Sequence, residues 1–260
     1  ARFAAAPFGL LEAGSGPDGG ALLPMTLRLV QAGLAGASTG GALRFKRLGP
    51  ETDDATLLRW IHRLQADRAR QAESRRQPLL AAEDGVQRSE LPRFDGGEPR
   101  ATEVVGVPLR ERGVHVVEAE SRVLGRSLLA QAAPMYVRTG VLVTNLGVHF
   151  KRGRSSSLVW VTSLDRGRPV RGAAVAVNDC RGRPLWSGPT DASGLARIPR
   201  GFDDEAWSDE ESERCPGRGG YFVTARAAGD LGCVFSDWQR GIEPWRFNQP
   251  LGRGSEPDRV

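Results

Sequence analysis

Alternation of apolar and polar side chains is the main signal in the first part of the chain. Residues 25–30 and 43–46 each present one apolar face and one mostly polar face, which is the period of a half-buried β-strand. The turn-forming stretch 36–41 lies between them, so a hairpin is the simplest connection. Strands are also predicted at 102–107 and 113–124. This part therefore reads as mainly β.

One segment has helical spacing instead. Thr52 or Asp53 can cap its start by accepting orphan backbone N–H groups, and Pro78 marks its latest possible end. We predict a helical insertion near 54–76. Its apolar side chains fall on one stripe of the helix: Leu57, Leu58, Trp60, Ile61 and Leu64.

Beyond residues 131–134, a weakly patterned stretch taken as a boundary, the chain consists almost entirely of strands and turns. The apolar run 158–161 predicts a strand that is buried on both faces. About seven short strands within roughly 100 residues are typical of a β-sandwich. The other predicted strands lie at 142–150, 170–178, 185–186, 221–227 and 231–238.

Length and composition agree with two globular domains. The chain has 260 residues, of which 40% are hydrophobic and 26% charged, and it has no apolar run long enough to cross a bilayer. Its first residues lack the pattern of a secretory signal, which leaves a cytosolic protein, a mature chain or an excised fragment.

The net charge of +5 comes almost wholly from arginine, but 31 acidic residues are scattered among the 36 basic ones. The arginines of the predicted helix are interleaved with Asp67 and Glu73, which indicates a solvated outer face rather than a phosphate-binding stripe. Nucleic-acid binding through this helix remains an alternative, and it would weaken steeply with added salt.

Two short motifs resemble chemical signatures without their structural context. Residues 14–19 fit G-x-G-x-x-G and residues 36–40 fit G-x-S-x-G, yet each is followed by a predicted strand where a helix is required. His62, His115 and His149 lack metal-ligand spacing. We therefore predict no catalytic residue, no metal and no cofactor, and an enzyme is the weakest class of function.

The cysteines and an acidic run both lie in the second part. The run 203–213 lacks the spacing of a calcium loop and is interpreted as a solvated loop, with calcium or a basic partner as alternatives. Cys180 and Cys215 flank it, and a disulfide between them would close a loop of about 35 residues, worth roughly 3–4 kcal/mol. Cys233 lies in an apolar alternation and is predicted to be a buried free thiol.

A series of short segments, taken in order, resembles bacterial alpha-2-macroglobulin-like proteins. The resemblance spans most of the chain and is carried by the order of the segments rather than by any one of them. They are residues 6–12, 22–27, 134–139, 142–151, 156–162, 190–194, 236–238 and 241–248.

This resemblance implies consecutive macroglobulin-like domains, each a seven-stranded antiparallel sandwich of the fibronectin type III kind. It also implies a very large periplasmic protein that traps proteases through a bait segment, in many members with a Cys-x-x-Gln thioester. Here the third residue after each cysteine is Arg183, Arg218 or Ser236, so this chain cannot form the thioester.

The expected organisation is a macroglobulin-like domain at 1–134 with the helical insertion, a second at 135–240, and a linker at 241–260. Trp245 and Phe247 in this linker would pack against a neighbouring domain. The expected role is a non-catalytic scaffold fragment of a protease trap.

The expected partners are the neighbouring domains of the full-length chain and host or competitor proteases, without nucleic acid. The expected location is the periplasm, with membrane association only through a lipid anchor outside this fragment; an inner-membrane anchor on the full-length protein is one option. The alternative is a secreted binding or adhesion module that recognises a protein or glycan through the 36–41 or 203–213 loops.

Overall fold

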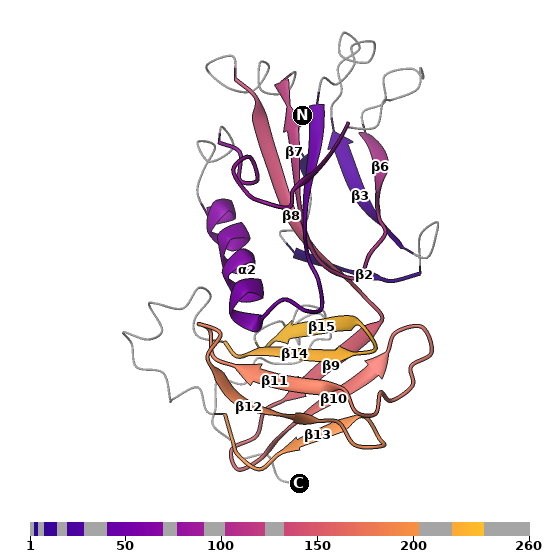
Figure 1. The fold of residues 1–260 in the computed structure, drawn as a ribbon, viewed down its shortest axis with the longest axis vertical. Coiled ribbons are helices and arrows are strands. Elements are labelled where there is room, and N and C mark those ends of the chain that lie inside the picture. The colour runs from indigo at the N-terminus through magenta and orange to yellow at the C-terminus, as the bar shows by residue number, and fades with distance from the viewer. Residues whose placement is uncertain are drawn as a thin grey trace, which may run out of the picture.

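The computed structural model describes residues 3–4, 8–14, 20–28, 41–69, 77–90, 102–122, 133–202 and 220–236. Two units follow one another along the long axis of the molecule (Figure 1). The first unit contains strands β1–β8 and helix α2, and the second contains strands β9–β15. The prediction of a mainly β protein with antiparallel sheets is confirmed. In the described residues, no helix is long and apolar enough to cross a membrane.

The first unit has two sheets and one helix. Its three-stranded sheet runs β1 (Phe3–Ala4), β3 (Ala21–Arg28), β6 (Thr102–Leu109). Its five-stranded sheet runs β2 (Phe8–Glu12), β8 (Met135–Thr144), β7 (Gly113–Ser121), β4 (Gly41–Leu48), β5 (Gln87–Glu90). Neighbouring strands are antiparallel except β2 and β8, which pair in parallel. The described strands of this unit thus number eight, where seven were expected.

The five-stranded sheet is covered on both faces, so its central strand β7 is buried on both sides. All nine residues of β7 are buried. Val117 and Ala119 pack toward the three-stranded sheet, whereas Val114 and Val116 pack toward helix α2. The first unit therefore has three layers, with the helix as the outer one (Figure 1).

Helix α2 spans Asp54–Ala69, and residues 70–76 of the predicted insertion lie outside the described residues. Of the two predicted caps, Asp53 is the one used, since its Oδ1 accepts the N–H of Thr56 at 2.8 Å. All five residues of the predicted apolar stripe are buried.

The second unit is a sandwich in which the structure describes strands β9–β15. Its core contains Val159, Val161, Val177, Ile198 and Val223. One sheet runs β12 (Pro184–Pro189), β11 (Ala174–Asn178), β14 (Phe222–Ala227), β15 (Asp230–Phe235). The other runs β13 (Leu195–Ile198), β10 (Ser157–Ser163), β9 (Leu146–Lys151). Neighbouring strands in both sheets are antiparallel.

The hairpin predicted from residues 25–30 and 43–46 is wrong. Residues 25–28 and 43–46 lie in strands, but β3 pairs with β6 in one sheet while β4 pairs with β7 over eight residue pairs in the other. Alternation identifies a strand with one apolar face, but it does not identify the strand's partner.

The prediction that residues 158–161 are buried on both faces is also wrong. Val159 and Val161 lie in the core, whereas Trp160 is 40% exposed on the opposite face. Both faces of β10 carry apolar side chains here, so composition alone could not separate a buried face from an exposed one.

Strand β8 belongs with the strands before it rather than with those after it. The expected organisation placed residues 135–144 in the second unit, but β8 pairs with β7 over its first nine residues and with β2 at its other edge. A single residue, Asn145, then leads into β9. The chain therefore passes between the units at Asn145.

Candidate functional site: the junction between the two units

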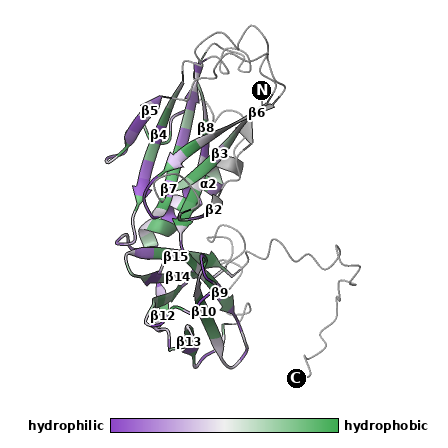
Figure 2. Cartoon of the chain, turned by 90° about the vertical axis from the view of Figure 1, so that its right-hand side faces the viewer, coloured by the Kyte–Doolittle hydropathy of each residue, from purple (hydrophilic) through white to green (hydrophobic). Residues whose placement is uncertain are grey.

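One hydrophobic cluster belongs to both units. Helix α2 and the five-stranded sheet contribute Trp60, Ile61 and Val116, and strands β14 and β15 contribute Phe222 and Phe235. The two phenylalanine rings lie 4.8 Å apart. Because the cluster contains apolar side chains of both units in contact, separation would expose apolar surface from both. Figure 2 shows hydrophobic colouring continuing from the first unit toward β14 and β15.

The N-terminus of α2 is bound to the second unit by hydrogen bonds. Asp54 accepts from Arg226 at 2.6 Å, from Asn178 at 2.7 Å and from the Thr224 hydroxyl at 2.9 Å. The same Arg226 guanidinium donates to the carbonyl oxygens of Pro50 and Thr52 at 2.8 Å. A carboxylate in the first turn also complements the helix dipole. This network joins the helix N-terminus to strands β11 and β14.

The turn between β11 and β12 approaches the same end of the helix. Gly182 has a φ of +82°, and a Cβ placed there would lie 2.7 Å from Cα of Ala55. The position therefore requires glycine both for its backbone conformation and for its approach to the helix.

The connection between the units at Asn145 is held by Asp230, a buried carboxylate of the second unit. Asp230 is 2% exposed and accepts from the Thr144 hydroxyl and the Asn145 N–H, both at 2.8 Å. Arg112 of the first unit pairs with it at 3.2 Å. These hydrogen bonds and the ion pair therefore stabilise the chain where it connects the two units.

A buried cluster of charges lies within the first unit beneath residues 77–80. Glu118 is fully buried and accepts from Arg138 at 2.9 Å and from Arg44 at 3.2 Å. It also accepts the Leu79 N–H at 2.5 Å, while Arg138 donates to the carbonyl of Gln77. A paired carboxylate of this kind fixes geometry because loss of any partner leaves a buried charge.

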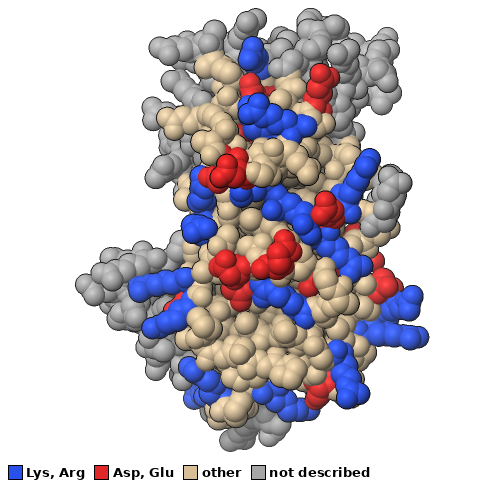
Figure 3. Space-filling model, in the orientation of Figure 1, with Lys and Arg blue, Asp and Glu red and all other residues tan. Residues whose placement is uncertain are grey.

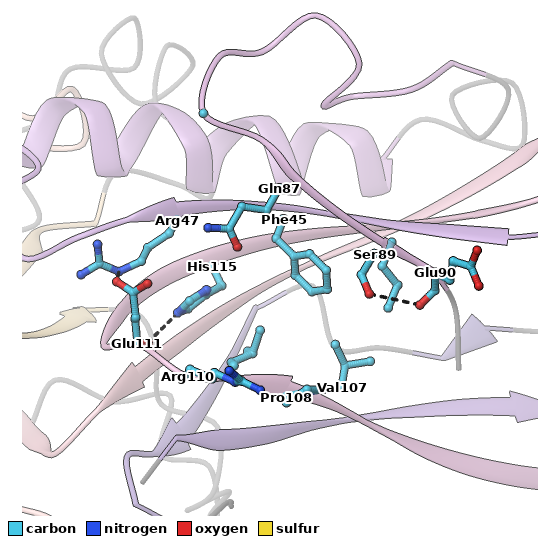
Figure 4. A pocket seen from close by; sticks show the side chains of 13 residues that line it. Phe45, Arg47, Gln87, Ser89, Glu90, Val107, Pro108, Arg110, Glu111 and His115 are labelled. Atoms are coloured by element: carbon cyan, nitrogen blue, oxygen red, sulfur yellow. Dashed lines mark hydrogen bonds and ion pairs between the residues drawn. The ribbon is translucent and has the colours of Figure 1, made fainter. Parts of the chain in front are cut away.

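A groove opens between the two sheets of the first unit, at the edges formed by β5 and β6. Its volume is about 370 Å³, and Phe45 and Val107 lie on its apolar side with His115 at one end (Figure 4). The His115 ring nitrogen lies 2.7 Å from the carbonyl oxygen of Glu111. Burial lowers the pKa of His115 below its usual value, with Arg47 adding to the effect.

The two strand edges beside this groove are poorly suited to pairing with an added strand. Pro108 removes a backbone donor from β6, and the four residues of β5 are polar and exposed, among them Arg88 and Glu90. These are common ways in which proteins protect sheet edges.

The three histidines occupy different environments. His62 lies half-buried on α2, where burial lowers its pKa, His115 lies at the groove, and His149 is exposed on β9 beside the Trp160 ring. Within the described ranges, no three His, Cys, Asp or Glu residues gather as metal ligands. Most of residues 14–19 and all of 36–40 lie outside those ranges.

The cysteines have two different environments. Cys180 is disulfide-bonded, and its predicted partner Cys215 lies outside the described residues, so this pairing stays a prediction. Cys233 is free and buried in the shared cluster. Burial raises its pKa to about 12, which keeps the thiol protonated and unreactive. Trp245, Phe247 and the acidic run 203–213 also lie outside the described residues.

Charges of both signs are mixed on the face seen in Figure 3, where blue and red side chains alternate over both units. On α2, Arg63 pairs with Glu83 at 2.7 Å and lies over the Trp60 ring. This face therefore lacks the single-sign stripe expected of a nucleic-acid interface.

The residues that join the units, namely Asp54, Arg226 and Asp230, could not be identified from the sequence. No local pattern pairs positions so far apart in the chain. A signal for Glu118 did exist, because a carboxylate among the apolar residues of a strand requires a partner wherever that strand is covered.

Comparison with protein families finds a match that covers the second unit. Residues 143–253 match the model described as the bacterial alpha-2-macroglobulin MG3 domain. The match begins two residues before Asn145, close to the passage between the units, and it extends into the segment expected to be a linker. No curated protein sequence matches the chain.

Solved structures of Escherichia coli alpha-2-macroglobulin share the fold. A crystal structure spanning domains MG0-NIE-MG1 is 19% identical, with a TM-score of 0.52 over 89% of this chain and 62% of that one. A second crystal structure, spanning NIE-MG1, is 17% identical, with a TM-score of 0.52 over 83% of this chain and 88% of that one.

The chain thus spans less than two thirds of the first of these structures, and 12% of the chain in a cryo-EM reconstruction of the whole E. coli protein. At such identities the likeness concerns the fold alone. The family match confirms the resemblance predicted from the sequence for residues 143–253, which are similar to the bacterial alpha-2-macroglobulin MG3 domain.

Proposed function

We propose that this chain is a non-catalytic scaffold of a bacterial alpha-2-macroglobulin-like protease trap that acts in the periplasm. The observation that carries the proposal is the match of residues 143–253 to the MG3 domain. In such a trap the bait would lie in another domain. A thioester would lie elsewhere too, because no cysteine here has a glutamine at the third position after it.

The junction supports a mechanical role. The shared hydrophobic cluster, the Asp54–Arg226 pair and the Asp230 contacts link the units at three places. Inter-domain interfaces within a chain are often small and polar, and they permit relative motion. A common core instead favours one rigid arm that would hold neighbouring domains at a fixed spacing while the rest of the trap rearranges.

The test uses the full-length protein that carries this chain, with trypsin as the protease. Trapping predicts that trypsin loses activity on casein but keeps activity on a small chromogenic substrate, since only the large substrate is excluded. Equal cleavage of casein with and without the protein would refute the proposal.

The contribution of this chain is tested by loosening the junction in the same protein. We expect Asp54→Ala to reduce protection of trypsin from casein, because the helix loses its bonds to β11 and β14. Glu51→Ala is the control, since Glu51 lies nearby and pairs with Arg47 only at 4.0 Å on the surface. If the two variants protect equally, the junction has no part in trapping.

The alternative of a secreted binding module rests on loops at 36–41 and 203–213 that lie almost wholly outside the described residues. The mixed charges of Figure 3 give no support to nucleic-acid binding through α2. A scaffold remains the function best supported by the family match and by the geometry of the junction.

A further inference from the structure

The outer face of the β9–β10–β13 sheet is unusual for a solvent-facing surface, because its centre is apolar. Trp160 is 40% exposed and lies in the middle strand. Its cross-strand partners are His149 on β9 and Leu195 on β13. The His149 and Trp160 rings lie 5.5 Å apart, and the indole N–H donates to the carbonyl of Ser193 at 3.2 Å. The indole is therefore held in place while part of the side chain stays accessible to solvent.

The next row of the same face is basic. Leu158 pairs across the strands with Lys151 on one side and Arg197 on the other. In the described part of the chain, neither Lys151 nor Arg197 makes an ion pair. These two residues and Arg152 also line a hollow of about 460 Å³ that extends beyond Leu158 at the end of the sheet.

One carboxylate lies near the tryptophan end of this face and is already occupied. Asp191 accepts the N–H groups of Ser193 and Leu195 at 2.8 and 3.0 Å. The Leu195 N–H is the main cause of its lowered pKa, and Arg197 adds a smaller effect. Among the described residues, Asp191 acts on Arg197 only weakly, and neither Lys151 nor Arg197 has a carboxylate within ion-pair distance.

We propose that this face is a docking surface for an acidic polypeptide segment that places an apolar side chain against Trp160 and carboxylates against Lys151 and Arg197. Its composition is that of a protein interface centre, with an exposed tryptophan and flanking cations, rather than that of an even basic field. Charge complementarity selects an acidic partner over a basic or neutral one. The inference is independent of the protease-trap function.

The test measures binding of short synthetic peptides to the 260-residue chain by isothermal titration calorimetry. The probe alternates Glu with Leu, and matched peptides carry Gln or Lys in place of Glu. We expect binding of the Glu peptide alone, weakening as salt is added. Failure of the Glu peptide to bind at low salt, or equal binding of the Gln peptide, would overturn the proposal.

Variants locate the binding. Lys151→Glu combined with Arg197→Glu should weaken the Glu peptide about tenfold or more, and Trp160→Ala about fivefold or more. Arg88→Glu combined with Arg110→Glu is the matched control, since it alters net charge equally on exposed residues of the first unit. Circular dichroism of each variant checks that the fold is kept. Equal weakening by the control pair would refute the assignment to this face.

The same assay distinguishes the proposed acidic partner from two other possible occupants of this face, a lipid surface and the acidic run of this chain. Vesicles of phosphatidylglycerol that bind through the same residues as tightly as the peptide would make the face a lipid surface. Higher peptide affinity after conversion of the acids of 203–213 to their amides would make this chain's own acidic run the occupant. Either result overturns the proposal.

Discussion

The five-stranded sheet of the first unit and the three-stranded β9–β10–β13 sheet of the second use charged residues in opposite ways. The first is covered on both faces and keeps Glu118, Arg138 and Arg44 inside, joined to one another. The second is covered on one face only and presents Lys151 and Arg197 outside without ion-pair partners in the described structure. Burial thus decides whether a charge on a strand organises the fold or remains available to a partner.

The cause of this difference is the layer that covers the second face of the five-stranded sheet. Helix α2 packs against Val114 and Val116 of β7, and residues 77–80 lie over Glu118. Through the helix, this face becomes part of the cluster that continues into β14 and β15. The helix therefore turns a two-layer sandwich into a three-layer unit and joins that unit to its neighbour.

The largest predicted effect comes from breaking the buried charge cluster. Glu118→Ala should lower the free energy of unfolding by about 3–5 kcal/mol, because it removes the buried carboxylate that accepts from Arg138, Arg44 and the Leu79 N–H. Urea unfolding followed by circular dichroism measures the change. Glu51→Ala, which removes a surface pair, should stay within about 0.5 kcal/mol. A loss below about 1 kcal/mol for Glu118→Ala would show that this region is hydrated.

The second effect concerns the bonds between the units. Arg226→Ala should cost about 2–3 kcal/mol, since it removes the donor to Asp54, Pro50 and Thr52. Hydrogen exchange should rise in the first turn of α2 and in β14. Arg226→Lys keeps the charge but not the planar fork, and it should fall between wild type and alanine. An unchanged exchange rate in α2 would contradict the proposed link.

Much of this architecture follows from local pattern, and the exceptions share one physical cause. The helix, its cap at Thr52 or Asp53 and the strands at β14 and β15 are encoded by side chains close together in sequence, so they could be predicted. The pairing of β4 with β7 and the Asp54–Arg226 contact join positions far apart, and periodicity carries no information about them. The exposed Trp160 was missed because an apolar run does not reveal which face is covered.

Comparing Gly182→Ala with Gly172→Ala separates the effect of the contact between the units from the effect of backbone strain. Gly182 and Gly172 have φ values of +82° and +73°, so alanine at either should cost about 1–2 kcal/mol. Only at Gly182 would the new Cβ meet Ala55 of the helix. We expect Gly182→Ala to be less stable than Gly172→Ala by roughly a further 1 kcal/mol, as for other overpacked sites. Equal unfolding midpoints would show that the turn does not press on the helix.

The smallest predicted effect appears only at alkaline pH. Burial raises the pKa of Cys233 to about 12, whereas an unfolded thiol ionises near 8.5. Below 8.5 the thiol is protonated in both states and stability is unaffected. Above it the unfolded state releases the proton first, so stability falls until the folded thiol also ionises near 12. Between pH 8.5 and 9.5 this loss should be about 1 kcal/mol, and Cys233→Ala should lack it.

The same thiol reports on opening of the junction, because it lies in the cluster that the two units share. In the native protein its alkylation should be slow, and it should speed up in Arg226→Ala and Gly182→Ala but not in Gly172→Ala. Alkylation that speeds up in all three variants alike would mean that Cys233 is exposed by global unfolding. Selective acceleration would instead mean that the units separate while each keeps its own sheets, since the residues altered in the two responsive variants contact the helix from the other unit.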